Sequence, residues 1–397
     1  MKKVMTGLIL LILCISFNSF AAGPDTFSTA PKLNKGRQWR IAYYEGGEYI
    51  EYKTTLIATI KGLMKTGWIE PAEIPDFPGE GTKSLWIWFS KNLKSKYLLF
   101  YKHTHYTCSW KDDIRKKTVN TIINRLNWKV KDIDLIIAMG TWAAEDLANG
   151  RHKTPTIAMA VSDALSAGII KSYEDSGYDH LHARVDPLRY ERQIQIFHDI
   201  IGFQKLGIIY EDTVRGKSYA SVDKVEKVAK EKGFEIVRCF IPKGVEDKKI
   251  AEESVKKCFA SLCNQVDAIY VTLHMGINKN SLPALVKIAN EKDIPTFSQA
   301  GSEEVKAGLL MSISQAEFKY IGQYYADTIA KIFNGAKPRQ LSQFFEEPSK
   351  IAINLKTAEQ IGYDPPIDIL SAADEILKYQ WEDHILSVLK NSRTDRI

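Results

Sequence analysis

Residues 135–150 read LIIAMGTWAAEDLANG, and the pattern changes in the middle of this stretch. The first five residues form a continuous apolar run, as in a strand that is covered on both faces. The residues after Gly140 and Thr141 have the pattern of a helix instead. The stretch therefore predicts a buried strand that passes directly into a helix, which is the repeating unit of parallel α/β sheets.

The same alternation of strand and helix continues on both sides of this stretch. Apolar runs predict further strands at residues 40–44, 96–101, 154–161, 205–210, 234–241, 267–273 and 294–298. Amphipathic patterns predict helices at residues 52–65, 114–126, 187–201, 219–232 and 248–262. Helices between strands indicate right-handed crossovers in parallel sheets. Because the series is too long for one sheet, we expect an α/β protein with two doubly wound parallel-sheet lobes.

The first residues have the pattern of a secretory signal peptide. Two lysines precede an apolar core at residues 8–17, and small residues occupy the −3 and −1 positions of a cleavage site that would release residues 1–21. Cleavage after Ala22 is the second choice. The large apolar residues before Cys14 do not fit a lipid-anchor signal. We therefore expect a soluble protein that is exported to a bacterial periplasm.

Charge and cysteine content limit the partners and the covalent bonds of the exported chain. Loss of residues 1–21 with their two lysines lowers the formal net charge from +6 to +4, which is too small and too dispersed for nucleic-acid binding. Hydrophobic residues make up 45% of the chain, as in ordinary soluble proteins. Export permits disulfides, and the remaining cysteines either form one of three full pairings or stay as thiols: Cys108, Cys239, Cys258 and Cys263.

Ligands of doubly wound sheets bind at the carboxyl ends of the strands, where the strand-to-helix loops meet. Gly140 would let a ligand approach the backbone, and Thr141 would either donate to a ligand oxygen or only cap the helix that follows. The helix N-terminus favours an anionic group such as a carboxylate. Aromatic residues near such loops would either stack on a planar solute or be strand residues: Tyr43, Tyr44, Tyr49, Trp142 and Tyr210.

No set of residues points firmly to catalysis. Residues 215–218, RGKS, resemble the end of a phosphate loop, but Glu211 stands where that pattern requires glycine. His103 and His105 have a spacing on one strand that would suit a metal-dependent enzyme, and residues 180–182 repeat it. A surface strand end explains this spacing equally well. We expect no enzyme activity, no cofactor and no metal.

Longer blocks of the sequence resemble one family. The blocks, in chain order, are MGTWAAEDLAN, AVSDALSAG, YERQIQIFHDIIGFQKLGIIYED, VDAIYVTLHMGINKNSLPALVKIANEKDIPTFS and INLKTAEQIGYDPPIDILSAADEI. Together they resemble the ABC-transporter solute-binding proteins of the tryptophan/tyrosine type, which implies two lobes joined by a hinge in the type I periplasmic binding protein architecture. With the strand order, the resemblance implies lobe 1 at 38–161 and 314–342, lobe 2 at 163–313, a hinge near 161–163 and a C-terminal segment at 343–397 that packs across the lobes.

The resemblance also implies where a solute binds and what the protein does with it. The predicted site residues lie in loops that follow the strands: Tyr44, Glu45, Gly46, Gly140, Thr141, Trp142, Ser162, Asp163, Asp212, Ser218, Thr272 and Gln299. We expect a monomer that captures an amino acid or a related, aromatic or planar solute by lobe closure. It would deliver the solute to the membrane permease of an ABC importer. The alternative is a periplasmic sensing module of the same fold that docks on a receptor or sensor kinase.

Overall fold

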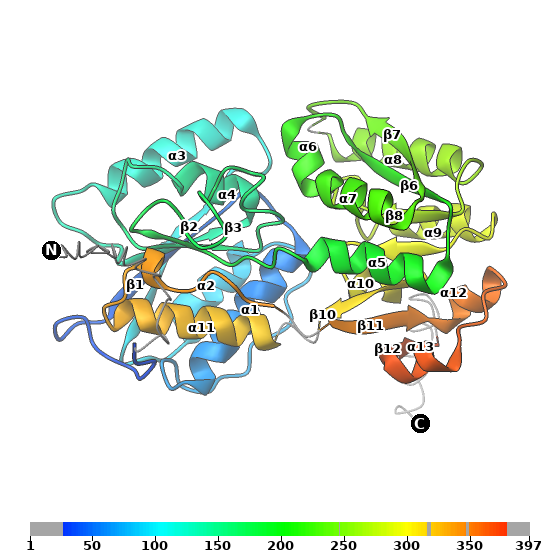
Figure 1. Ribbon diagram of the computed structural model, residues 1–397. Helices are drawn as coiled ribbons and strands as arrows, with labels where there is room; N and C mark the ends of the chain where they lie inside the picture. Colours follow the sequence, from blue (N-terminus) through cyan, green and yellow to red (C-terminus); the bar gives the residue numbers. More distant parts are fainter. Residues whose placement is uncertain (1–26, 246, 316–318, 347–348, 379–397) are drawn as a thin grey trace, which may run out of the picture.

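The computed structural model describes residues 27–245, 247–315, 319–346 and 349–378, which form two α/β lobes with one sheet each (Figure 1). The first sheet is parallel and has the strand order β2-β1-β3-β4-β5. Its strands are β1 (Trp39–Glu45), β2 (Leu98–Thr107), β3 (Leu135–Met139), β4 (Thr156–Met159) and β5 (Leu181–Ala183). β3 is buried along its whole length, as its apolar sequence predicted.

Helices cover both faces of the first sheet because alternate residues of each strand point to opposite faces. The face that contains Tyr43 packs against α1 (Ile50–Lys65), α2 (Lys83–Asn92) and α11 (Lys319–Phe333). The face that contains Tyr44 packs against α3 (Asp112–Leu126) and α4 (Gly140–Leu147). α1 and α11 approach closely at Gly62, where a Cβ would lie 2.7 Å from the Gly322 carbonyl oxygen.

The second sheet has the strand order β12-β11-β10-β9-β8-β6-β7, with β10 and β11 as its antiparallel pair. Its strands are β6 (Lys205–Glu211), β7 (Glu235–Ile241), β8 (Ala268–Val271), β9 (Thr296–Ser298), β10 (Met311–Gln315), β11 (Ser349–Asn354) and β12 (Ala373–Leu377). The other elements of the chain are α5 (Arg189–Ile201), α6 (Val214–Tyr219), α7 (Val222–Lys232), α8 (Lys248–Leu262), α9 (Leu282–Asn290), α10 (Ser302–Lys306), η1 (Pro338–Gln340), α12 (Leu355–Gln360) and α13 (Ile367–Ala372).

The pairing of β5 corrects one expected boundary. Residues 163–183 were expected in lobe 2, but β5 pairs with β4 and is the edge strand of the first sheet. A bridge between Val185 and Phe344 then brings the segment after η1 against the same lobe. The chain thus enters the second lobe before α5, about twenty-five residues later than the sequence indicated.

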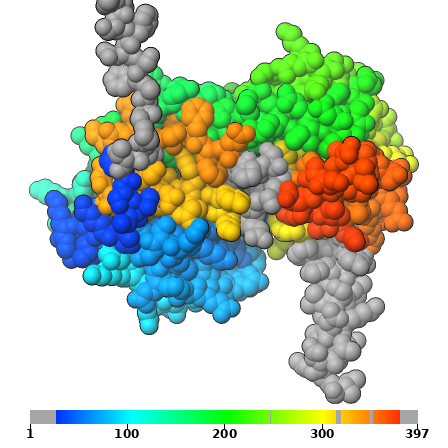
Figure 2. All heavy atoms as spheres, turned by 60° about the horizontal axis from the view of Figure 1, so that its bottom comes forward, coloured from blue at the N-terminus to red at the C-terminus, as the bar shows by residue number. Residues whose placement is uncertain are grey.

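The strands near the C-terminus correct a second boundary. The segment from residue 343 was expected to pack across both lobes, but β11 and β12 extend the second sheet, and β10 keeps residues 314 and 315 in that sheet too. In Figure 2 the residues that follow β11 lie on one lobe, whereas α11 lies against the other. Residues 1–21, the expected signal peptide, and residues 379–397 lie outside the described part.

A disulfide between Cys239 and Cys258 joins β7 to α8, so the structure has neither one of the three full pairings nor four thiols, the two alternatives considered from the sequence. Cys108 and Cys263 are buried thiols. The helix expected at 219–232 is divided into α6 and α7 at Ser221, which has a left-handed backbone with φ of 50°. None of the helices in the described ranges combines the length and the apolar character that a membrane span requires.

Candidate functional site

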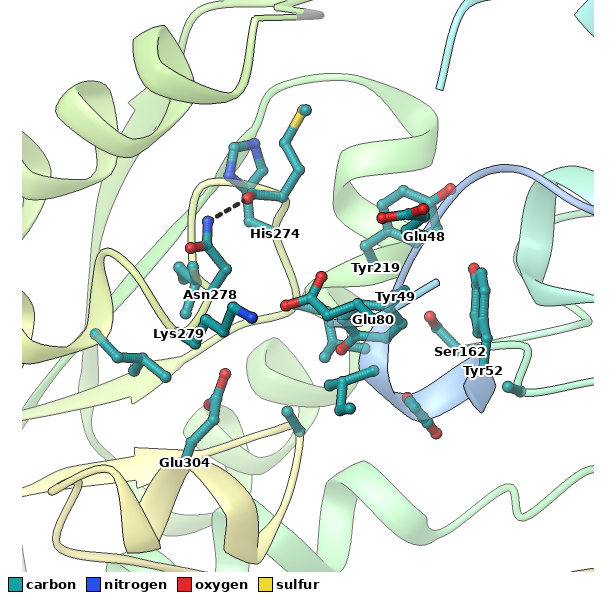
Figure 3. Close-up of a pocket in the computed structure, with 18 of the residues that line it drawn as sticks. Glu48, Tyr49, Tyr52, Glu80, Ser162, Tyr219, His274, Asn278, Lys279 and Glu304 are labelled. Carbon is teal, nitrogen blue, oxygen red and sulfur yellow. Dashed lines mark hydrogen bonds between the residues drawn. The ribbon is translucent and has the colours of Figure 1, made fainter. Parts of the chain in front are cut away.

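A cavity of about 2170 Å³ lies between the two lobes. From the first lobe it is lined by the loop after β1, the first turn of α1, the N-terminus of α4 and the loop after β4. The second lobe contributes the end of β6 with α6, the loop after β8 and α10. Figure 3 shows how side chains from these segments point into one space. These segments follow the carboxyl ends of the strands, where the sequence predicted the binding loops.

The joint between β3 and α4 forms part of the wall. Gly140 has φ of +84°, and any Cβ there would collide with the Tyr52 hydroxyl, so both the backbone and the space require glycine. α4 begins at Gly140, and its N-cap position is Met139, without a side-chain capping bond. Thr141 is therefore not the helix cap, which was one of the two roles considered for it. Thr141 lines the cavity and is 4% exposed.

Tyr219 of the second lobe lies next to Thr141 of the first. Burial raises the pKa of the Tyr219 phenol, and a hydrogen bond with the Thr141 side chain opposes that shift. Tyr52, from the first turn of α1, places its hydroxyl next to Gly140 at the junction of β3 and α4. The N-terminus of α4 therefore faces an enclosure made by one threonine hydroxyl and two tyrosines.

Glu45 ends β1 and is held by a chain of hydrogen bonds. Its Oε2 accepts from the Tyr43 hydroxyl at 2.8 Å and from the Thr82 hydroxyl at 2.7 Å. Because Thr82 gives its proton to Glu45, it accepts from His105 Nε2 at 2.8 Å, which makes Nε2 the protonated nitrogen. Burial raises the pKa of Glu45 to about 7 and lowers the pKa of His105 to about 4. A cation in the cavity would favour the ionised form of Glu45.

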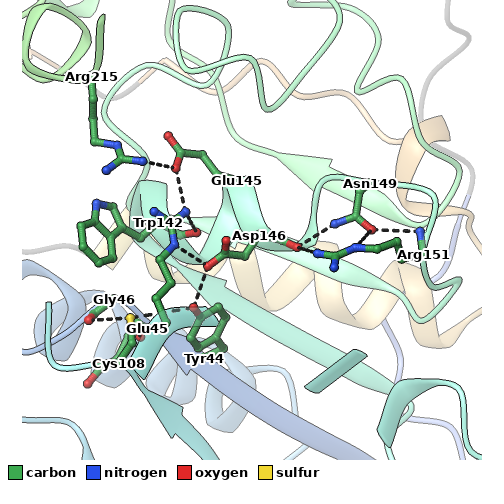
Figure 4. Close-up of polar contacts among 11 residues, drawn as sticks. Tyr44, Glu45, Gly46, Cys108, Trp142, Glu145, Asp146, Asn149, Arg151 and Arg215 are labelled. Atoms are coloured by element: carbon green, nitrogen blue, oxygen red, sulfur yellow. Dashed lines mark hydrogen bonds and ion pairs between the residues drawn. The ribbon is translucent and has the colours of Figure 1, made fainter. Parts of the chain in front are cut away.

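The guanidinium groups of two arginines lie near the Trp142 ring at the edge of the cavity, and Figure 4 shows one of them, that of Arg215, beside the ring. Arg115 lies 4.6 Å from the ring centroid and Arg215 lies 5.2 Å from it. Both arginines also bind one oxygen of Glu145, at 2.8 and 3.1 Å. Arg215 belongs to α6 of the second lobe, whereas the other three residues belong to the first lobe. This cluster therefore joins the lobes. Its two guanidinium groups contact the Trp142 ring, which the sequence analysis had considered for stacking on a solute.

The wall of the second lobe has its own polar groups. Glu304 lines the cavity and accepts from the Ser298 hydroxyl at 2.6 Å, and burial raises its pKa to about 7. His274 lies 3.6 Å from Glu211, a pair that lowers the pKa of the glutamate. Ser218 is 6% exposed, and its hydroxyl has no hydrogen-bond partner. A buried hydroxyl without a partner favours a site that binds a polar ligand.

The structure brings five of the predicted site residues to the cavity: Glu45, Thr141, Trp142, Ser162 and Ser218. Seven predicted residues do not line it: Tyr44, Gly46, Gly140, Asp163, Asp212, Thr272 and Gln299. Tyr44 points to the opposite face of the sheet and donates to Asp146 at 2.7 Å. Gly46 is covered by the Trp110 ring, and Asp163 accepts backbone hydrogen bonds in its own turn.

Two of these seven residues, Thr272 and Gln299, support the wall of the second lobe from behind, whereas Asp212 lies in a surface ion pair. Thr272 donates to the carbonyl of Ile209 in β6. Gln299 donates to the Tyr219 carbonyl at 2.8 Å and accepts from the backbone of the loop after β8, so it fixes two lining segments. Asp212 pairs with Lys217 of the same lobe at 2.9 Å.

Several lining residues were not among those predicted from the sequence. They include Glu48, Tyr52, Glu80, Arg215, Tyr219, Lys279 and Glu304. The turn after the first predicted strand already placed Tyr49 near the loops, and a helix from there would have placed residue 52 on the same face. Glu80 and Tyr219 reach the cavity through tertiary packing, for which the sequence contains no local signal.

The histidines considered for metal binding have other roles. His105 belongs to the hydrogen-bond chain of Glu45, and His103 stacks on Tyr101 at 5.2 Å. In the described part of the chain, no three histidine, cysteine, aspartate or glutamate side chains are grouped so that they would hold a metal ion.

Comparisons with known proteins agree with this architecture. A family model for ABC transporter substrate binding proteins matches residues 102–377. A tyrosine-binding protein from Clostridioides difficile (strain R20291) is 26% identical over 230 residues, which are 57% of this chain and 63% of that relative. The chain thus spans less than two thirds of the length of that relative.

Solved structures share the fold at low sequence identity. A conserved domain protein from Vibrio cholerae O1 biovar El Tor has a TM-score of 0.64 at 18% identity, and an ABC domain in complex with L-Trp from Streptococcus pneumoniae has 0.65 at 16%. Both alignments cover 86% of this chain and 100% of the other. They confirm the expected two-lobe architecture of the type I periplasmic binding proteins. Because the family model covers more than half of the sequence, the chain belongs to the family of ABC transporter substrate binding proteins.

Proposed function

We propose that this protein captures a small solute related to the amino acids in the cavity between its lobes and delivers it to the permease of an ABC importer. The supporting observation is that the strand-end loops of both lobes converge on one cavity, which is lined by tyrosines and a few buried polar groups. Aromatic walls with a few fixed, buried polar groups are typical of small-molecule sites. The work of the protein is binding in the periplasm, without chemistry.

The N-terminus of α4 is the proposed site for the solute carboxylate. Thr141 supplies a hydroxyl, and the first amides of the helix supply N–H groups at the positive end of its dipole. Because Thr141 is not needed as a cap, its hydroxyl serves the cavity. Tyr219 would contact the same carboxylate from the other lobe.

Aromatic walls favour a solute with a planar or aromatic group. Tyr49 and Tyr52 meet edge to face, with ring centroids 5.2 Å apart, and both line the cavity. Their rings present apolar faces with polar tips, which suits an aromatic amino acid. The relative from Clostridioides difficile, which is named as tyrosine-binding, supports the same class of solute.

Closure of the lobes is the proposed mechanism of capture. A cavity of about 2170 Å³ exceeds the roughly 300–1,000 Å³ of a typical small-molecule site, so an amino acid would be enclosed on all sides only after the lobes approach further. The solute would stabilise the closed state because it makes more contacts there than in the open state. The connection between the lobes at residues 184–188, between β5 and α5, would form part of the hinge.

A thermal-shift screen tests the proposal. Amino acids, aromatic amines and sugars would be added singly to the purified mature protein at millimolar concentration. We expect amino acids with a ring to raise the melting temperature, since a ligand that binds only the folded state stabilises it. Stabilisation by sugars alone would contradict the proposed solute class.

A further inference from the structure

The two walls of the cavity differ in charge. The wall from the first lobe contains six acidic side chains and one lysine: Glu45, Glu48, Glu51, Glu80, Asp112, Glu145 and Lys83. The wall from the second lobe has five acids and five lysines or arginines among its described residues. The chain as a whole has a formal charge of +6, so the acidic wall is a local feature and not a consequence of composition.

Two of these acids, Glu48 and Glu80, line the same part of the cavity as Tyr49 and Tyr52, which lie just before and within α1. Glu48 precedes Tyr49 in the loop after β1, and Glu80 comes from the segment before α2 (Figure 3). Glu145 is neutralised by its two arginines. In contrast, none of the salt bridges between described residues involves Glu45, Glu48 or Glu80. A carboxylate group beside aromatic rings is the environment that binds organic cations.

Two observations besides the number of acids indicate that the cavity binds a polar ligand: the way Glu45 is held and an unpaired hydroxyl group. Both hydrogen bonds to Glu45 reach the same oxygen, Oε2, and both come from hydroxyl groups, so the carboxyl is fixed in place without a cationic partner. In the second lobe, Ser218 is 6% exposed, lines the same cavity and has no partner for its hydroxyl. A buried carboxyl group is expected to have a charged partner when it is ionised.

We propose that the solute carries a net positive charge, as an amino-acid-like molecule with an additional basic group. Its basic group lies against Glu45, Glu48 and Glu80, beside the rings of Tyr49 and Tyr52. This inference rests on the proposed function and narrows it, because it requires that a cationic solute binds more tightly than a neutral solute of the same shape.

Four probes with one phenylalanine skeleton test the inference. They carry an aminomethyl group, an ethyl group, a carboxyl group or only hydrogen at the para position, so the first two differ in charge but hardly in size. Calorimetric titration of the full mature protein should give an affinity for the aminomethyl compound that is at least about 10-fold above that of the ethyl compound, as expected for an added hydrogen bond to a charged group. The carboxyl compound should bind most weakly.

Glutamate-to-glutamine variants test which side chains cause the preference for a cationic probe. Glu48→Gln combined with Glu80→Gln should reduce the ratio of the affinities for the aminomethyl and ethyl probes by about 10-fold, and Glu45→Gln should act in the same direction. Since Glu45 also supports the fold, the double variant of the exposed Glu48 and the half-buried Glu80 is the decisive one, and Glu70→Gln, outside the cavity, is its control. Equal binding of the aminomethyl and ethyl probes would overturn the inference but not the proposed function. Absence of binding by all four probes would contradict both.

Discussion

Arg215 offers the sharpest test of how the lobes are coupled. It extends from α6 of the second lobe to Glu145 and Trp142 of the first, at 3.1 Å from the carboxylate and 5.2 Å from the ring centroid. Arg115 binds the same two residues from within the first lobe. Arg215→Gln therefore leaves Glu145 and Trp142 with a partner and removes only the contact between lobes.

The magnitude follows from the exposure of the groups. The Arg215 side chain is 40% exposed and that of Glu145 is 22% exposed, so the ion pair contributes about 0.2–1 kcal/mol. The contact with the indole ring adds about 0.5–1 kcal/mol. A loss of about 1–2 kcal/mol changes the ratio of joined to separated lobes about 5- to 30-fold. Solute affinity falls by up to the same factor if the solute binds the joined state.

Small-angle scattering of the unliganded protein and calorimetric titration with phenylalanine measure these two effects. We expect Arg215→Gln to increase the radius of gyration and to weaken binding about 5-fold or more. Lys217→Gln is the matched control, because Lys217 lies on the same helix but pairs with Asp212 inside the second lobe. Unchanged scattering and unchanged affinity in the arginine variant would refute the reasoning that this contact joins the lobes.

Three further predictions concern binding, covalent structure and pH. Thr141→Val should weaken binding of phenylalanine by about 10- to 150-fold, the loss of one hydrogen bond to a charged group, with little change in melting temperature, and unchanged calorimetric affinity would exclude the carboxylate site. Replacing Cys239 and Cys258 by serine should lower the free energy of unfolding by about 3 kcal/mol because the bond closes a loop of 19 residues, whereas Cys263→Ser should cost less in the same denaturant titration. Burial lowers the pKa of His152 to about 4, so the unfolded chain takes up a proton at this residue first as the pH falls below about 6.5, and the contribution of His152 to stability should drop by about 2 kcal/mol from pH 7 to pH 5. Glu45 and Glu304, whose pKa values are raised by burial, shift stability in the opposite direction over this range. In urea titrations at pH 7 and pH 5, the change in the free energy of unfolding between the two pH values should differ by about 2 kcal/mol between His152→Asn and the unsubstituted protein. The same change in both proteins would contradict the role given to His152.

The fold was predictable from the sequence where strands are long and apolar. LIIAM, KLGIIY and DAIYVTL all became buried strands of parallel sheets, since hydrophobic runs between amphipathic helices have few other solutions. The boundary between the lobes was not predictable, because β5 has three residues and contains His182, so it lacks an apolar run. The antiparallel return of β11 likewise depends on contacts distant in sequence.

The candidate site was predictable only where it depends on local chain order. Glu45 ends a strand and Thr141 lies two residues after one, so both were identified by the rule that ligands bind at the carboxyl ends of parallel strands. That rule does not say whether a side chain points to the cavity or away from it, and Tyr44 and Gln299 turned out to face elsewhere. Tyr219 joins the site because the lobes face each other, which no local pattern encodes.

The central claim is that the cavity between the lobes binds one small solute related to the amino acids. Native mass spectrometry of the mature protein, as purified and after dialysis against the para-substituted phenylalanine probes, tests it most directly. The account predicts a complex of one protein with one probe, which is lost or weakened in the Thr141→Val variant. Absence of any one-to-one complex with the probes, together with a bound molecule of another class in the purified protein, would contradict it.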